Sequence, residues 1–279
     1  MGKLNPTHGD RRLVWGDDFT APEIDRAKWF LSDMMTAADM RREACPETLE
    51  QKDGLLTLRC SKFAEPQEDG KEYHVPPFPI TKSTMEFRYG YFEIRAKIPY
   101  HYGNSGAFWF CATHKTATNL RPEIDMVELL GKEDNCVSNL HTWGDFHTSF
   151  DGKIPRAARS HTFPTSGDAL SEEFHTYSMD WTPDKIDFAV DGEVYCSCPL
   201  TEDGKANFRK IEGKELDLNV FRVPVYFILS EFLYTPARKL GWGLKGDEEP
   251  FTYTMQVEHV ALYQREGEEL YVGDALNRQ

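Results

Sequence analysis

The segment 122–131 constrains the fold more than any other part of the chain. It reads Pro-Glu-Ile-Asp-Met-Val-Glu-Leu-Leu-Gly, and half of its residues are Ile, Met, Val or Leu. Such a composition is typical of a strand buried in a β-sandwich. The segment nevertheless carries three carboxylates, Glu123, Asp125 and Glu128. Because unpaired charge is costly to bury, these acidic residues indicate a partner or a chemical task.

The spacing of the three carboxylates predicts an irregular strand. Side chains alternate between the two faces of a strand, so Glu123 and Asp125 would share one face and Glu128 would lie on the other. One additional residue, a β-bulge at Met126 and Val127, would bring all three to the same face. Carboxylates so placed repel each other, so that one can be ionised while another holds a proton, as acid/base hydrolysis requires. Taken alone, the string also fits a solvated helix face.

The motif at 123–128 resembles the active-site motif Glu-[Ile/Leu]-Asp-x-x-Glu of glycoside hydrolase family 16, in its bulged form. That family includes laminarinases, agarases, carrageenases and porphyranases. Further blocks resemble the family in the same order, and the resemblance extends from about residue 13 to residue 264. These blocks are residues 87–99, 106–110, 174–183, 186–193 and 255–264.

The resemblance implies an all-β fold, a concanavalin A-like jelly roll of two antiparallel sheets with a concave substrate cleft. Sequence patterns favour the same class, since helical periodicity is scarce and turn signals are frequent. Asp53-Gly54 and Asp191-Gly192 each predict a two-residue hairpin turn. Segment 64–79 is polar and rich in Pro, and we expect it to be a surface loop. We expect one catalytic domain over residues 1–279, with its core at about 13–264.

The resemblance also implies roles for the three carboxylates. Glu123 corresponds to the nucleophile and Glu128 to the general acid/base, with Asp125 tuning protonation between them. Glu128 must then be protonated in the first step, so we expect burial and acidic neighbours to raise its pKa. The implied reaction is retaining, endo-acting hydrolysis of internal β-1,3 or β-1,4 linkages by double displacement, if the carboxyl groups lie about 5–5.5 Å apart.

Other side chains are candidates for binding the sugar. Trp109 is the first candidate for a platform under a sugar ring. His141 and Trp143 share a face of the predicted neighbouring strand, although a single histidine is more often structural. Weaker candidates are Arg88, Asn104, Glu231 and Trp242.

The sequence constrains the identity of the substrate less than it constrains the catalytic reaction. Typical laminarinases have Trp-Pro before the block Ala-Phe-Trp, whereas this chain has Ser105 and Gly106 there. A polysaccharide or oligosaccharide of glucan or galactan type, or a host glycan, therefore remains open. Two alternatives to hydrolysis also remain: a transglycosylase on the same fold, and a carbohydrate-binding protein without activity.

The composition of the chain disfavours several classes of binding partner. The net charge of −14 disfavours nucleic acid and anionic membranes, and no apolar run is long enough to span a membrane. The six cysteines show no metal-binding spacing and are expected to be reduced and mostly buried. We expect a monomer that requires no cofactor or catalytic metal, although a structural calcium is possible by resemblance. No hydrophobic leader occurs near Met1, which leaves the localisation open between cytoplasmic and secreted.

Overall fold

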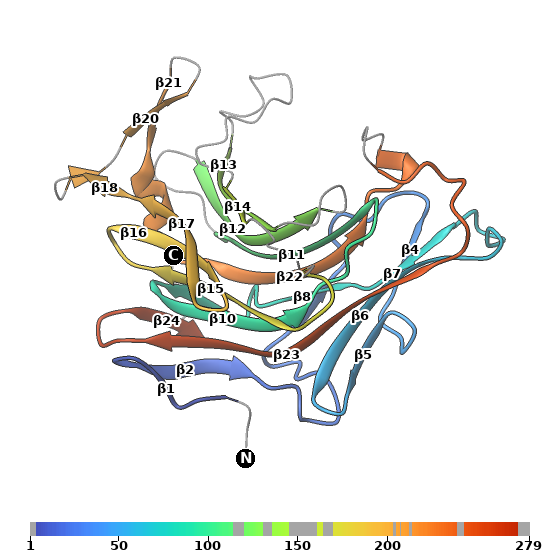
Figure 1. The fold of residues 1–279 in the computed structure, drawn as a ribbon, viewed down its shortest axis with the longest axis horizontal. Coiled ribbons are helices and arrows are strands. Elements are labelled where there is room, and N and C mark those ends of the chain that lie inside the picture. Colours follow the sequence, from blue (N-terminus) through green and yellow to red (C-terminus); the bar gives the residue numbers. More distant parts are fainter. Residues whose placement is uncertain are drawn as a thin grey trace.

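The computed structural model describes residues 4–113, 120–130, 136–144, 161–163, 170–202, 205–206, 208–211, 214–238 and 243–272. Two large sheets pack face to face, one curved over the other (Figure 1). The predicted fold class, an all-β sandwich of jelly-roll type, is confirmed.

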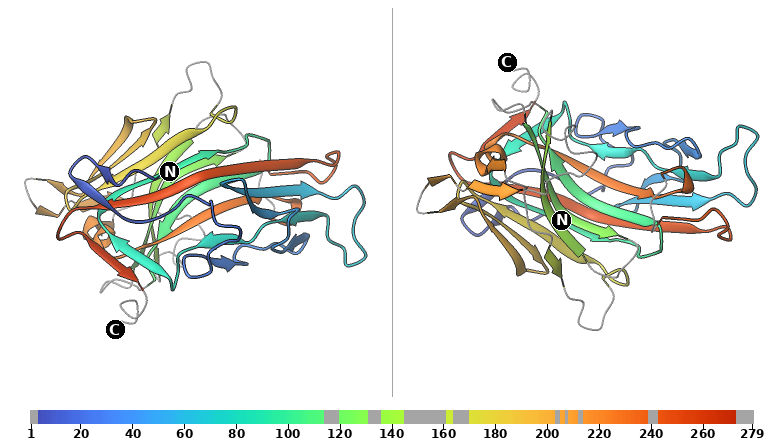
Figure 2. Two further views of the ribbon diagram at one scale, coloured as in Figure 1. Left: turned by 90° about the horizontal axis from the view of Figure 1, so that it is seen from below. Right: turned by 90° about the horizontal axis from the view of Figure 1, so that it is seen from above.

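The first sheet has the order β17-β16-β15-β10-β23-β6-β7-β4; in addition, β2 pairs with β23 and β1, and β5 pairs with β6. Its pairs are antiparallel except for β4 with β7. Seen from below, the long strand β23 runs along this layer (Figure 2). Its strands are β1 (Thr7–His8), β2 (Arg11–Asp17), β4 (Met40–Arg42), β5 (Leu49–Lys52), β6 (Leu55–Lys62), β7 (Tyr73–Val75), β10 (Gly90–Lys97), β15 (His175–Trp181), β16 (Lys185–Val190), β17 (Glu193–Pro199) and β23 (Thr252–Gln264).

The second sheet has the order β14-β13-β12-β11-β22-β8-β3, and it is curved, with the hollow side of the curve turned away from the first sheet (Figure 1). Its strands are β3 (Phe30–Ser32), β8 (Phe78–Ile80), β11 (Asn104–Cys111), β12 (Leu120–Leu130), β13 (Cys136–Gly144), β14 (His161–Phe163) and β22 (Tyr226–Leu233). Short elements complete the described chain: β9 (Met85–Arg88) with β24 (Glu269–Val272), β18 (Thr201–Glu202) with β19 (Lys205–Ala206), β20 (Phe208–Ile211) with β21 (Lys214–Asp217), and the 3-10 helices η1 (Leu218–Arg222) and η2 (Pro236–Arg238).

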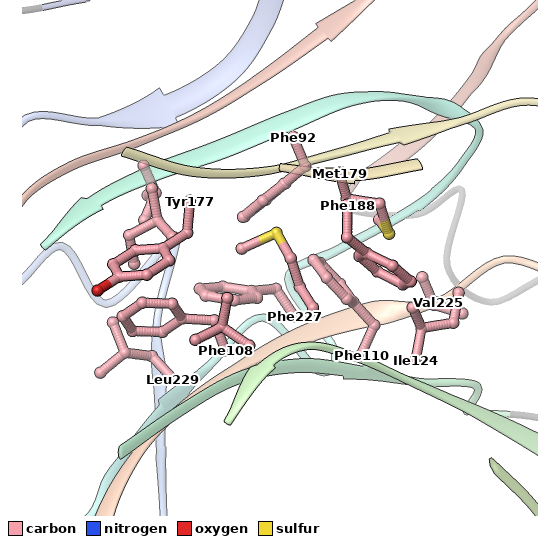
Figure 3. Close-up of a cluster of buried hydrophobic side chains, with 14 of the residues drawn as sticks. Phe92, Phe108, Phe110, Ile124, Tyr177, Met179, Phe188, Val225, Phe227 and Leu229 are labelled. Atoms are coloured by element: carbon pink, nitrogen blue, oxygen red, sulfur yellow. The ribbon is translucent and has the colours of Figure 1, made fainter. Parts of the chain in front are cut away.

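Aromatic rings from both sheets fill the space between them. Phe92 of β10 contacts Phe110 of β11 and Phe227 of β22, with ring centroids 5.0 and 4.8 Å apart (Figure 3). Each such pair contributes about 0.5–1.5 kcal/mol beyond the burial of its area. Alternation explains the arrangement, since every second residue of β10 is buried. The face of the second sheet that points away from this core is not needed for packing between the sheets, and it can carry a functional site.

Both predicted hairpin turns are confirmed. Asp53 and Gly54 connect β5 to β6 with φ of 53° and 72°, and Asp191 and Gly192 connect β16 to β17 with φ of 49° and 82°. Positive φ at both central residues is the geometry that matches the right-handed twist of paired strands, and Asp-Gly adopts it at low cost.

The expectation of a surface loop at 64–79 is wrong for its second half. Tyr73–Val75 and Phe78–Ile80 form β7 and β8, and all six residues are buried. Pro76 and Pro77 separate the two short strands, and Pro79 lies within β8.

The cysteine prediction is confirmed for the cysteines whose side chains are described. None of these five forms a disulfide: Cys60, Cys111, Cys196 and Cys198 are buried, and Cys45 is half-buried. Within the described ranges, no helix has the length and apolar character needed to cross a membrane.

Candidate active site

The predicted β-bulge is present in β12. Ala107 of β11 lies opposite Glu128 and Phe108 opposite Val127, but the next residue, Trp109, lies opposite Asp125. On the other side, the register of β13 shifts between the same two carboxylates. Met126 and Val127 are both fully buried between the sheets. Two consecutive inward side chains restore Glu128 to the face of Glu123 and Asp125.

The three carboxylates line a cavity of about 350 Å³ on the hollow face of the second sheet. Of the sequence-predicted residues, the structure brings Trp109 and His141 to the same cavity. Alternation places them, because odd-numbered residues of β11 and β13 face outward next to β12. The full lining is Met35, Ser105, Ala107, Trp109, Glu123, Asp125, Glu128, His141, Ser230, Phe232 and Tyr234.

Each carboxylate has a polar neighbour on an adjacent strand. The Cys111 thiol donates a hydrogen bond to Oε2 of Glu123, with 3.4 Å between sulfur and oxygen. The Nε2 atom of His141 lies 3.0 Å from Oδ2 of Asp125. These partners follow from the register, since Cys111 and His141 both lie opposite Glu123 on the two flanking strands.

The third carboxylate is held in the same way. The side-chain amide of Asn139 donates a 2.7 Å hydrogen bond to Oε2 of Glu128. Asn139 lies opposite Asp125 on β13 and is buried, so its amide is fixed at this position. The bulge brings Glu128 within its reach.

Burial and repulsion change the protonation of this group of carboxylates. Burial and, next in size, the charge of Asp125 raise the pKa of Glu123 to about 8. The charge of His141 and the hydrogen bond from Cys111 oppose this shift. The Cys111 thiol stays protonated, because burial and the charges of Glu123 and Asp125 raise its pKa. Cys111 is therefore a hydrogen-bond donor in this site.

Trp109 forms an aromatic part of the cavity wall. Its indole Nε1 donates a 3.0 Å hydrogen bond to the Ser230 hydroxyl, which fixes the ring. The ring is half-buried and packs in a cluster with Phe232 and Tyr234. A fixed, partly exposed indole next to carboxylates offers an apolar face to a sugar ring.

Three sequence-predicted binding residues lie away from the cavity. Asn104 and Glu231 are fully buried, because they share the inward phase of Phe108 on β11 and of Phe227 and Leu229 on β22. Arg88 pairs with Glu269 across the β9–β24 ribbon. The structure contradicts a cleft position for all three.

The remaining two tryptophans cannot be placed. The backbone of Trp143 pairs with Arg121, but its side chain lies outside the described residues, as does the whole of Trp242. Their contribution to sugar binding stays a prediction.

The sequence analysis did not identify several residues that line the cavity or contact its carboxylates. Cys111 and Asn139 could have been found from strand phase, since they alternate with Trp109 and His141. Met35 comes from a distant loop, where it has a φ of 63°, and its position gave no local signal. Ser230 depends on the pairing of β22 with β11, which a single sequence does not specify.

Within the described residues, two clusters converge enough donor atoms to hold a metal ion. They are Glu123, Asp125 and His141 in the cavity, and Glu43, Cys45 and His74 elsewhere. Calcium prefers six to eight oxygen ligands, so these mixed sets with nitrogen or sulfur do not fit it. The structural calcium stays a prediction without an assigned ligand set.

Carboxylates grouped beside an aromatic wall in a β-sandwich cleft define the class of glycoside-cleaving enzymes. The family model described as glycosyl hydrolases family 16 matches residues 47–221. The chain belongs to glycosyl hydrolase family 16, as the motifs predicted.

Relatives with known activities resemble most of the chain. A keratan-sulfate endo-1,4-β-galactosidase of Sphingobacterium multivorum is 26% identical over 261 residues, which are 91% of this chain and 55% of that enzyme. The chain thus spans about half the length of this curated relative.

Solved structures agree with the fold over nearly the full chain. One, from work on endo-acting O-glycanases by which prominent human gut bacteria initiate mucin breakdown, has a TM-score of 0.71 and 27% identity, with 94% of both chains covered. Another is SCLam, a non-specific endo-β-1,3(4)-glucanase of the same family, with a TM-score of 0.70 and 25% identity over 94% of this chain and 95% of SCLam.

Proposed function

We propose that the chain is a retaining endo-β-glycosidase that hydrolyses internal β-1,3 or β-1,4 linkages of a glucan- or galactan-type polysaccharide. The observation that carries the proposal is the placement of Glu123, Asp125 and Glu128 on one face of β12, inside a cavity with an aromatic wall. Family membership supports this chemistry.

The proposed first step is displacement of the leaving sugar. A carboxylate oxygen of Glu123 attacks the anomeric carbon, while Glu128 donates its proton to the glycosidic oxygen, whose bond to that carbon breaks. In the second step Glu128 takes a proton from water, and the resulting hydroxide displaces Glu123. The configuration at the anomeric carbon is retained after two inversions, and no cofactor is needed for either step.

The neighbours of Glu123 favour its reactive form. Attack requires the ionised carboxylate, whereas burial raises the pKa of Glu123 to about 8. The thiol of Cys111 and the imidazole of His141, if protonated, stabilise the anion and lower its pKa. Asp125 lies in contact with His141, so we assign to it the role of orienting this imidazole and sharing a proton with Glu123.

The small side chains that β11 contributes to the cavity lining indicate which sugars the cavity can accommodate. Ser105 and Ala107 are small, so the stretch of β11 before Trp109 carries no bulky ring. This leaves room for a substituted sugar or an axial hydroxyl, and relatives of this chain act on β-glucans, keratan sulfate and mucin O-glycans. We therefore place galactose-containing polymers beside β-glucans as candidate substrates.

A screen of purified protein on laminarin, lichenan, agarose, porphyran, carrageenan, β-1,4-galactan, keratan sulfate and mucin glycans tests the proposal. We expect one polymer class to yield a ladder of oligosaccharides from the wild type and none from Glu123→Gln. NMR of the first product should show the β-anomer. If the wild-type protein binds a polysaccharide of the panel but cleaves none of them, the chain is a carbohydrate-binding protein and the roles proposed for Glu123 and Glu128 are rejected.

Added acceptor sugar distinguishes hydrolysis from transglycosylation. Both share the glycosyl-enzyme intermediate, and they differ in whether water or a sugar hydroxyl completes the second step. Products longer than the substrate, formed at the expense of hydrolysis, would show that the chain is a transglycosylase.

A further inference from the structure

A second group of chemically active side chains lies outside the carboxylate cavity, at the edge of the first sheet. It consists of Glu43 and Cys45, which directly follow β4, and His74 in the centre of β7. These two strands pair in parallel, with Arg41 opposite His74. The pairing brings residues about thirty positions apart in sequence to one point.

The donor atoms of this group converge. Nε2 of His74 lies 2.7 Å from Oε1 of Glu43 and 3.8 Å from Sγ of Cys45, and Sγ lies 4.0 Å from Oε1 of Glu43. Tetrahedral zinc with ordinary bond lengths would separate such ligand atoms by about 3.4–3.6 Å. The sulfur distances exceed this by a few tenths of an ångström. The nitrogen–oxygen distance is shorter because these two atoms share a hydrogen bond, and the half-exposed Glu43 side chain can adjust.

The surrounding structure fixes the loop that carries the thiol. The buried Thr48 hydroxyl donates to the backbone carbonyl of Glu43, at 2.5 Å, and accepts from the Cys45 amide, at 3.3 Å. The imidazole of His74 is 9% exposed and stacks on Phe63, with centroids 5.4 Å apart and an interplanar angle of 22°. A rigid loop and an oriented imidazole are what a preorganised ligand set requires.

A fourth donor lies within reach of the same point. Glu47 follows Cys45 by two residues, and its carboxyl accepts a hydrogen bond from the Cys45 thiol. The side chain is fully exposed and can turn toward the other donors. Two carboxylates, one thiol and one imidazole together can complete a four-coordinate shell.

We propose that Glu43, Cys45, Glu47 and His74 form a binding site for a borderline divalent cation of the zinc type. Thiolate and imidazole select zinc, cobalt or copper over calcium and magnesium, which prefer oxygen alone. The ion would connect the 43–48 loop to β7 and thereby hold the edge of the first sheet. This site goes beyond the glycosidase proposal and does not depend on it.

Metal binding to this set releases protons. The ligand form of cysteine is the thiolate and that of histidine is the neutral imidazole, so affinity falls as the pH is lowered. The ion also binds the folded chain in preference to the unfolded one, so it raises the melting temperature in proportion to the logarithm of its concentration.

Titration of the chelator-treated chain with Co²⁺ and Zn²⁺ tests the site. We expect one Co²⁺ to bind with a thiolate-to-metal absorption band, and Zn²⁺ to displace it. Cys45→Ser should abolish the band and weaken Zn²⁺ binding by at least about 100-fold, and His74→Gln should weaken binding by at least about 10-fold. A chain that binds neither ion, or a Cys45→Ser variant that keeps the band, overturns the proposal.

Two controls separate this site from the catalytic cavity, which also holds a histidine, carboxylates and a thiol. Cys111→Ser should leave the absorption band intact, and loss of the band there would assign the metal to the cavity instead. His175→Gln removes another histidine–carboxylate pair, with 2.6 Å between Nδ1 and Oδ2 of Asp191, and should leave binding unchanged. Circular dichroism of Cys45→Ser and His74→Gln verifies that each variant is folded.

Discussion

The side-chain amide of Asn139 donates a hydrogen bond of 2.7 Å to Oε2 of Glu128. A donor to the ionised form of a carboxyl group lowers its pKa. The two residues come from adjacent strands, and the bulge in β12 makes their contact possible. If Glu128 has its proposed role of general acid, this contact works against the protonated form that the first step requires, so we expect the amide to limit the pH range of activity.

Replacing Asn139 by Leu should therefore shift the alkaline limb of activity. Without the donor, the pKa of Glu128 rises, so we expect the alkaline limb of the kcat/KM profile to move upward by about one pH unit, the equivalent of one charge-assisted hydrogen bond. The measurement is initial rate against pH on the substrate found in the screen. An alkaline limb at the wild-type position would show that another group titrates there.

The Cys111 thiol should govern the opposite limb. Cys111→Ala removes a donor to Glu123, so the pKa of Glu123 rises and the acidic limb of kcat/KM moves to higher pH, with kcat reduced about tenfold at neutral pH. Cys111→Ser keeps a hydroxyl donor and should retain most of the activity. Equal losses in both variants would indicate a packing role for Cys111 instead.

The ionisation of Glu123 should also be visible in the stability of the protein. Because the pKa is raised to about 8 in the folded state from 4.5, the folded chain binds this proton more tightly than the unfolded chain does. The resulting stabilisation is complete below pH 4.5 and is lost as the pH rises through 8, by on the order of 5 kcal/mol. Glu123→Gln cannot ionise, so its free energy of unfolding in urea should fall less than that of the wild type between pH 5 and 8.5. Parallel curves for the two proteins would contradict the raised pKa.

Glu231 should behave as a neutral core residue. Burial raises its pKa well above the ordinary value, with Asn104 opposing this shift, so the carboxyl is protonated at neutral pH. We expect Glu231→Gln to change the free energy of unfolding by less than about 1 kcal/mol at pH 7 and to be more stable than the wild type at pH 9.

The control for Glu231 is Glu231→Ala, which opens a cavity and should cost about 2–4 kcal/mol. Hydrolytic activity of the Gln variant should equal that of the wild type. A large rise of KM in Glu231→Gln would instead support the sugar-binding role that its sequence position suggested.

Sequence reasoning predicted the fold and the centre of the site because both depend on local patterns. Alternation around Glu123 and Glu128 required a bulge, and Asp-Gly pairs marked two hairpins, so the carboxylate face and the two hairpin connections could be inferred. The assignment of the carboxylates to one cavity needed no long-range information, since all three lie on one strand.

The positions of the other site residues depended on the phase of their strands and on contacts between residues that are distant in sequence. Glu231 and Asn104 were weak candidates for sugar binding, but the phase of their strands turns both side chains into the core, and a shift of one residue is enough for this. Met35 reaches the cavity from a loop about seventy residues before β11. No pattern around it in the sequence specifies that approach.

The paired inward residues of β12 also determine which changes in chain length the strand tolerates. Deleting either Met126 or Val127 would restore plain alternation, and the carboxylates at 123, 125 and the former 128 would then stand at even intervals. They would stay on one face at the cost of a single buried side chain. Deleting Ile124 would make Glu123 and Asp125 consecutive in the chain, and their side chains would then point to opposite faces of the strand. We therefore expect that a one-codon deletion at Met126 or Val127 keeps the three carboxylates on one face of the strand. A one-codon deletion at Ile124 would separate Glu123 from the other two.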